Sequence, residues 1–140
     1  MIDFDSTLAE TDCRAADYII LHPDQVGSPE MQYEQFVCKL VKEMGSRTLN
    51  LLHAAVGISG EAGELLDAVK KHWAYEKPLD FGNVVEELGD LEFYMAAMRQ
   101  IIGMSRQAIL QTNVNKLKLR YANMEYSDQA AQARADKADN

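Results

Sequence analysis

Hydrophobic residues recur at helical spacing through most of the chain. The strongest signal covers about residues 48–75, where one apolar stripe advances by three or four positions at each step. Its members are Leu51, Ala55, Ile58, Ala62, Leu65, Val69 and Trp73. A second such stripe, over about residues 80–102, consists of Val84, Leu88, Leu91, Met95, Met98 and Ile102. This spacing is typical of two amphipathic helices that each bury one face.

Two shorter helices are expected over about residues 30–44 and 105–122. Ser28 and Pro29 are suited to begin the first, and Gly45 to end it. Its apolar positions are Phe36, Leu40 and Met44, and those of the later helix are Leu110, Val114, Leu117 and Tyr121. Other residues typical of helix ends are Asp80, Gly103, Ser105 and Ser127.

The fold class predicted from these elements is all-α, a helical bundle. The 140 residues suit a single domain over 1–140, with 1–28 and 127–140 peripheral. Prolines are few and lie only at positions 23, 29 and 78, which favours helices over a sheet. A thin helical domain of this size needs further surface to bury, so we expect oligomerisation to complete the bundle.

The formal net charge of −8 argues against binding nucleic acid, because a broad acidic surface repels phosphate backbones. A small phosphate ligand remains compatible if divalent metal lies between it and the acidic groups. No apolar run approaches a membrane span, and the N-terminus lacks the pattern of a signal peptide. A cytoplasmic protein without a membrane partner is therefore expected.

Four carboxylates carry the candidate chemistry. Glu61 and Glu64 are three residues apart on the first strong helix, and Glu87 and Asp90 are three apart on the second. Residues at this spacing are neighbours on one helical face. Two antiparallel helices would bring all four carboxylates to one place, where they need a cation to stay ionised. Hard oxygen ligands select Mg²⁺, or else Mn²⁺.

These acids also have explanations other than a metal site. Either pair alone is better explained as a surface pair bridged to Lys or Arg, and only the combination favours metal. Gly57, Gly60 and Gly63 add support, because a glycine inside a helix costs about 1 kcal/mol relative to alanine and a plain solvated face does not need it. Di-iron bundles use Glu-x-x-His, and no glutamate in the sequence has a histidine three residues later.

A basic strip follows in the helix expected over 105–122. Asn113, Lys116 and Arg120 are spaced three and four residues apart and lie beside its apolar face. Arginine binds phosphate through two parallel N–H donors, so the strip is suited to a triphosphate. Taken alone, a solvated basic face near a helix C-terminus is the better interpretation. Lys70, Lys71 and Lys77 are weaker candidates of the same kind.

The order of these motifs resembles the MazG-like nucleotide pyrophosphohydrolases of the all-α NTP pyrophosphatase superfamily. The matching pieces are Gly60-Glu61-Ala62-Gly63-Glu64-Leu65, then Glu87-Leu88-Gly89-Asp90, then Asn113-x-x-Lys116-Leu117-x-x-Arg120-Tyr121. Residues 70–80 also look like the small single-domain phage and bacterial members. The resemblance covers about residues 48–135, and the first 45 residues do not add to it.

The resemblance implies hydrolysis of a (deoxy)nucleoside triphosphate to the monophosphate and pyrophosphate. The residues expected to hold Mg²⁺ are Glu61, Glu64, Glu87 and Asp90. Either Glu61 or Glu64 would orient the attacking water. The residues expected to contact the phosphates are Asn113, Lys116 and Arg120. A homodimer or homotetramer with sites near the subunit interface is implied as well.

Several functions stay open on the sequence alone. Nucleotide pool control through dGTP or another dNTP is one, and related hydrolases of dUTP or of phosphoribosyl-ATP use similar helices. The alternative of another class is a non-catalytic helical interaction protein whose acidic pairs form a solvated face.

Overall fold

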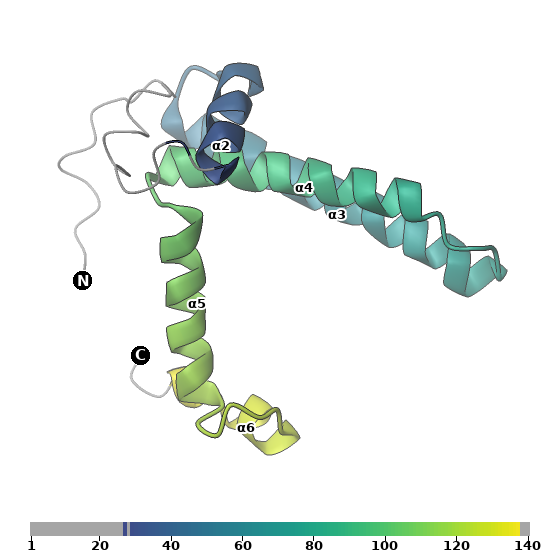
Figure 1. The fold of residues 1–140 in the computed structure, drawn as a ribbon, viewed down its shortest axis with the longest axis vertical. Coiled ribbons are helices and arrows are strands. Elements are labelled where there is room, and N and C mark those ends of the chain that lie inside the picture. Colours follow the sequence, from purple (N-terminus) through teal and green to yellow (C-terminus); the bar gives the residue numbers. More distant parts are fainter. Residues whose placement is uncertain (1–26, 28, 138–140) are drawn as a thin grey trace. The chain divides into compact units, whose positions relative to one another are not determined.

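The computed structural model describes residue 27 and residues 29–137, and every regular element within them is a helix (Figure 1). The chain divides after Gly103 into two compact units. The first contains α2 (Pro29–Leu40), α3 (Arg47–Tyr75) and α4 (Phe81–Ile102), and the second contains α5 (Arg106–Arg120), α6 (Asp128–Ala133) and the 3₁₀ helix η2 (Ala135–Lys137). The predicted all-α class is confirmed.

Residues 1–26 and Ser28, the expected cap of the first helix, lie outside the described residues. None of the helices in the described part combines the length and the apolar character that crossing a membrane requires.

Side-chain caps explain why the predicted helix starts are nearly right. The Oγ atom of Ser46 accepts a hydrogen bond from the backbone N–H of Leu49 at the start of α3. Asp80 caps α4 in the same way, and Ser105 caps α5. Gly103 ends α4 with a φ of 67°, the left-handed conformation that glycine adopts without strain.

The predicted end of the helix over 30–44 is wrong, because α2 stops at Leu40. The linker that follows is held by Asn50 of α3. The Asn50 side chain accepts from the backbone N–H of Met44 at 2.8 Å and donates to Glu43 at 2.8 Å. Gly45, with a φ of 83°, therefore shapes this linker rather than ending the helix.

Helices α3 and α4 run side by side as an antiparallel hairpin (Figure 1). The buried residues of α3 are the small ones, Ala54, Gly57 and Ala68. The ring of Tyr94 lies directly over Gly57, where a Cβ atom would overlap it. Small residues thus let the two backbones approach closely.

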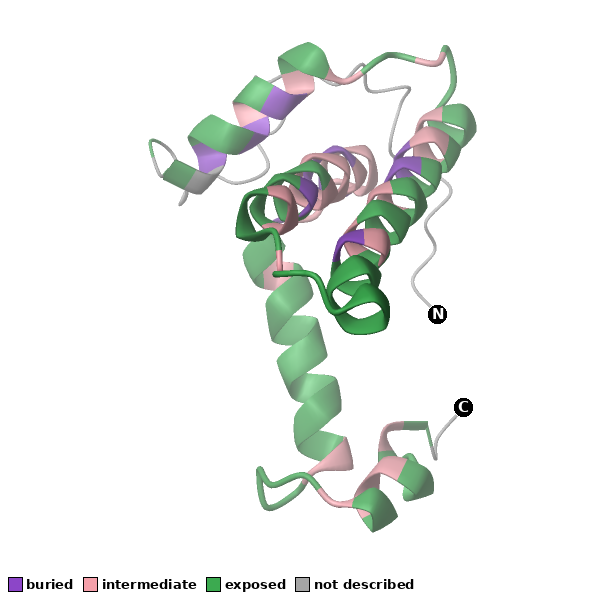
Figure 2. Ribbon diagram, turned by 90° about the vertical axis from the view of Figure 1, so that its right-hand side faces the viewer, coloured by how far each residue is buried: buried purple, intermediate pink, exposed green. Residues whose placement is uncertain are grey.

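The expectation that the apolar stripe of α3 faces the core is wrong at its C-terminal end, whereas Leu51, Ile58 and Leu65 are half-buried. Val69 is 44% exposed and Trp73 is 81% exposed. Figure 2 shows the buried positions on the sides where α2, α3 and α4 face one another, and an exposed outer face on α3. The helices pack against the face of α3 that carries the smallest side chains, because only this face allows a close approach. The larger side chains of Val69 and Trp73 therefore remain exposed.

Helix α2 covers the C-terminal part of α4 and completes a small core there. Val37 of α2 and Ala96 and Ala97 of α4 have no exposed surface. Glu34 of α2 is buried beside them and forms an ion pair with Arg99 of α4, with 2.6 Å between Oε1 and Nη2. This charge pair fixes α2 on α4.

The second unit is built around α5, which has no buried residue. Ser127 caps α6 through a hydrogen bond from the backbone N–H of Ala130, so the short helix expected after residue 127 is present. η2 follows, and its Asp136 contacts Arg120 at the end of α5.

Candidate metal centre

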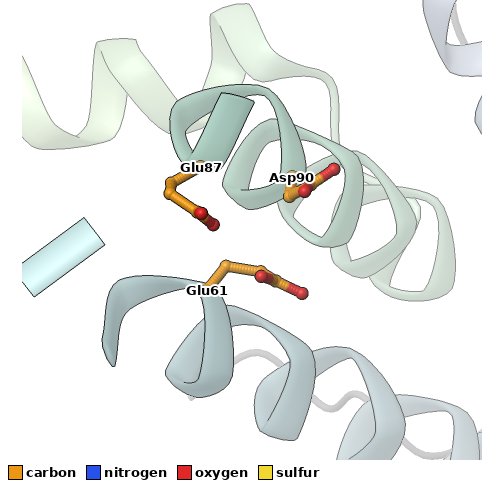
Figure 3. A group of neighbouring side chains, drawn as sticks. All are labelled: Glu61, Glu87 and Asp90. Carbon is orange, nitrogen blue, oxygen red and sulfur yellow. The ribbon is translucent and has the colours of Figure 1, made fainter. Parts of the chain in front are cut away.

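Three of the four predicted carboxylates converge. Glu61 extends from α3, and Glu87 and Asp90 extend from α4, into the space between the helices (Figure 3). One oxygen from each of the three lies within 4.8 Å of the others. Glu64 lies outside this group, although its charge acts on Glu61.

The local sequence explains this convergence. Glu61 is one helical turn after Gly57, and Asp90 is one turn before Tyr94, whose ring lies on Gly57. The contact between Gly57 and Tyr94 therefore sets the helices close together just before the acids. Glu87 and Asp90 are three residues apart, so both reach the same gap.

Glu87 is the most buried of the three acids, with 7% of its surface exposed. The side-chain amide of Asn83 donates to its Oε1 at 2.6 Å. Asn83 lies in the first turn of α4, where its own backbone N–H donates to the cap Asp80. It orients Glu87, and sequence reasoning missed it; the signal was its position four residues before Glu87 on the same face.

The electrostatics of the group are unfavourable without a cation. Burial raises the pKa of Glu61 above its ordinary value, and the negative charges of Glu64, Asp90 and Glu87 raise it further. Within residues 29–137, no lysine or arginine forms an ion pair with any of the three converging carboxylates. A bound cation would relieve this repulsion.

The donor set fits a hard divalent ion. Mg²⁺ binds carboxylate oxygens at about 2 Å, so oxygens on opposite sides of one ion are about 4 Å apart. The observed separations, all within 4.8 Å, are close to this value. The group contains neither histidine nor cysteine, which makes softer metals a poorer match.

The surface of α3 beside the glutamates is open. A Cβ atom at Gly60 or Gly63 would meet nothing within 4 Å. The helix glycines thus divide into two kinds, since Gly57 is needed for helix packing whereas Gly60 and Gly63 leave space next to Glu61 and Glu64. That space is available to a ligand.

Lys71 and Lys77, the weaker phosphate candidates, are both exposed. The Nζ atom of Lys71 pairs with Asp67 at 2.9 Å. The hydrogen bond that Lys71 donates to Asp67 raises the pKa of Lys71, and the charges of Asp67, Asp80 and Glu87 add to the rise. Lys71 thus lies within the electrostatic influence of Glu87, one of the three converging carboxylates. The backbone carbonyl of Lys77 accepts a hydrogen bond from Nδ1 of His72 at 2.6 Å, so this histidine holds the segment that connects α3 to α4.

Asn113, Lys116 and Arg120 belong to the second unit, on α5. Asn113 and Lys116 are exposed to solvent. Arg120 is half-buried and is held by Asp136.

A profile of the MazG nucleotide pyrophosphohydrolase domain matches residues 49–124, more than half of the chain. The match spans the four acids and the Asn113–Lys116–Arg120 strip and confirms the resemblance seen in the sequence. Comparison with curated proteins and with solved structures gives no match.

Proposed function

Because the chain belongs to the MazG nucleotide pyrophosphohydrolase family, we propose that it hydrolyses a nucleoside triphosphate to the monophosphate and pyrophosphate, with Mg²⁺ at the carboxylate group. The observation that carries this proposal is the convergence of Glu61, Glu87 and Asp90, with no lysine or arginine among residues 29–137 in an ion pair with any of them. Such a group is costly in a protein that does not bind metal.

Glu61, Glu87 and Asp90 are the proposed metal ligands, and Glu64 joins them if the site holds more than one ion. The metal supplies charge stabilisation at the phosphates and lowers the pKa of a bound water. Asn83 keeps the Oε1 atom of Glu87 pointed into the group. Mn²⁺ satisfies the same oxygen ligands.

Glu64 is the better of the two candidates for orienting the attacking water. Glu61 lies within the three-carboxylate group, whereas Glu64 lies outside it and is exposed beside the open surface at Gly63. A carboxylate that is not required as a ligand is available to accept a proton from water. On this assignment, Glu64→Gln removes turnover and retains metal binding, whereas Glu61→Gln weakens both.

Asn113, Lys116 and Arg120 are proposed to contact the phosphates, and Lys71 and Lys77 are weaker candidates for the same role. Their positions in the family motif support this role, since all three residues of the strip lie inside the matched region. The cationic groups would balance the phosphate charge that the metal leaves uncompensated.

A deoxynucleoside triphosphate, with dGTP as one example, is the proposed substrate class, and control of the nucleotide pool is the proposed role. The experiment that tests this is pyrophosphate release from a panel of NTPs and dNTPs, with dUTP and phosphoribosyl-ATP included, each with and without Mg²⁺. Mg²⁺-dependent release from at least one dNTP is expected. No release from any compound would contradict the proposal and favour a non-catalytic interaction protein.

A homodimer or homotetramer is proposed because large apolar side chains stand on the outside of α3 and α4. Those of α3 include Leu52, Val56, Leu66 and Trp73, and those of α4 include Phe81 and Val85. Exposed apolar surface of this extent marks interaction sites. Leu66→Glu and Trp73→Glu should shift the mass measured by light scattering towards that of the monomer. A wild-type protein that already has the mass of a monomer would contradict the proposal.

A further inference from the structure

Arg120 is held by a carboxylate that lies outside the family match. Asp136 of η2 accepts from Nε of Arg120 at 2.7 Å and from Nη2 at 2.8 Å. This is the parallel two-bond arrangement in which arginine and carboxylate fit best. The matched region ends at residue 124, so the family motif does not account for Asp136.

The pair is shielded and keeps its charge. The Asp136 side chain has no exposed surface, and 17% of the Arg120 side chain is exposed. The hydrogen bonds from Arg120 lower the pKa of Asp136 to about 2, so the carboxylate is ionised at neutral pH. Arg134 lies 3.7 Å from the same carboxylate and supplies a second positive charge.

Two roles are conceivable for a carboxylate on a phosphate-binding arginine. It either competes with the phosphate or holds the guanidinium in place for it. Competition requires Arg120 to leave Asp136, which would break two charge-assisted hydrogen bonds and leave the carboxylate with Arg134 alone, 3.7 Å away. Holding requires only that donors remain. Asp136 takes two of the five N–H groups of the guanidinium, and the Tyr121 side chain takes a further hydrogen bond, so N–H groups are still left for a phosphate.

The local charge balance favours holding as well. Arg120, Arg134 and Asp136 together carry one net positive charge, because the second arginine offsets the carboxylate. The cluster therefore remains attractive to an anion while Asp136 stays bound.

We propose that Asp136 is a positioning residue that fixes the Arg120 guanidinium at the end of α5, with its remaining N–H edge presented to the substrate phosphates. This inference rests on the proposed function for the role of Arg120. It adds a residue from the C-terminal segment to the substrate site.

Asp136→Asn tests the inference, and Asp128→Asn is the matched control. The control removes the same charge from the same segment, but Asp128 accepts from the Tyr126 hydroxyl and not from an arginine. KM and kcat are measured for the best substrate, and the dissociation constant is measured for inorganic tripolyphosphate with Mg²⁺. Asp136→Asn should raise both KM and the dissociation constant by about five-fold with kcat little changed. Asp136→Glu should restore part of the loss.

The Arg120→Ala background separates positioning from structural support. There, Asp136→Asn should have no further effect on KM, since the residue acts through the missing guanidinium. A fall in KM would show competition and overturn the inference, as would an unchanged KM in folded Asp136→Asn protein. If the wild type hydrolyses none of the compounds, the proposed function fails, and the affinity for tripolyphosphate alone tests the role of Asp136. If the wild type also does not bind tripolyphosphate, the inference about Asp136 is overturned as well.

Discussion

The two halves of α4 differ in what covers them. Over residues 91–102 the helix packs between α2 and α3, and Ala96 and Ala97 are fully buried. Over residues 81–90, α3 is the only described helix of the first unit that lies against it, and the outward side chains Phe81 and Val85 are 73% and 68% exposed. The covered half is thus a completed core, whereas the open half exposes apolar surface.

The halves also balance their charges in different ways. In the covered half, Glu34 is paired with Arg99 and accepts a further hydrogen bond from Gln100. In the open half, Glu87 and Asp90 face Glu61. A buried acid with an arginine partner fixes structure, and clustered acids without one hold a place for a cation. We therefore expect substitutions in the covered half of α4 to change stability, and substitutions in the open half to change the proposed metal chemistry.

The largest expected effect comes from removing a carboxylate of the open half. Glu87→Gln or Asp90→Asn should lower kcat by about 10³-fold or more, because the substitution removes a proposed metal ligand. Glu86→Gln is the control, since Glu86 is exposed and outside the carboxylate group. Pyrophosphate release is the readout, with circular dichroism to verify helicity. Near wild-type turnover in folded Glu87→Gln protein would remove the basis for the site.

Damage to the covered half should change stability instead. Arg99→Met leaves Glu34 buried without its cation and should lower the free energy of unfolding by about 3–5 kcal/mol. Urea unfolding measures the loss, and Lys70→Met at an exposed ion pair with Asp67 is the control, with little change expected. At a temperature where Arg99→Met is folded, its kcat should remain close to that of the wild type. A selective loss of kcat would contradict the division between the halves.

Gly57 and Gly60 of α3 test the close packing of α3 on α4 where the two halves of α4 meet. Gly57→Ala places a methyl group against the Tyr94 ring and should destabilise the fold by about 1–3 kcal/mol. Gly60→Ala meets open space and should stabilise α3 by up to about 1 kcal/mol. Thermal unfolding compares the two variants. Equal changes of the same sign would show that the contact between Gly57 and Tyr94 does not set the helix spacing.

The smallest expected effect is a pH dependence of stability. The pKa of Glu61 is raised in the folded metal-free protein, so between the unfolded and folded pKa values the folded state binds more protons than the unfolded chain. The free energy of unfolding contributed by Glu61 therefore falls as pH rises through that window. Mg²⁺ binds the ionised acids, so it should raise the melting temperature more at about pH 8 than at about pH 5. A Mg²⁺ effect that is independent of pH would argue against this group as the binding site.

Much of the fold was predictable from local signals. Asp80, Ser105 and the terminating Gly103 were identified in the sequence, whereas the role of Ser46 as the cap of α3 was not; the bounds of α3, α4 and α5 still differ from the predicted ones by no more than two residues. The end of α2 was missed because it depends on Asn50, which reaches back from the next helix. Contacts between elements are not encoded in periodicity.

The candidate site was predicted only in part, for a similar reason. The spacing of the acids indicated their convergence, but the buried face of α3 depends on which side lets α4 approach, and the small side chains at Ala54 and Gly57 outweigh the larger apolar stripe. The hydrogen bond from Asn83 to Glu87 has a local signal, whereas the pairing of Asp136 with Arg120 spans a turn and a helix and has none.

Mn²⁺ binding followed by electron paramagnetic resonance tests the central claim most directly. The titration is made with an α,β-methylene triphosphate analogue present, which resists cleavage at the proposed bond. The wild type should bind Mn²⁺. Most of that binding should be lost in the variants Glu61→Gln, Glu87→Gln and Asp90→Asn, and it should be retained in Glu86→Gln. Equal Mn²⁺ binding by the wild type and all three carboxylate variants would contradict a metal centre between α3 and α4.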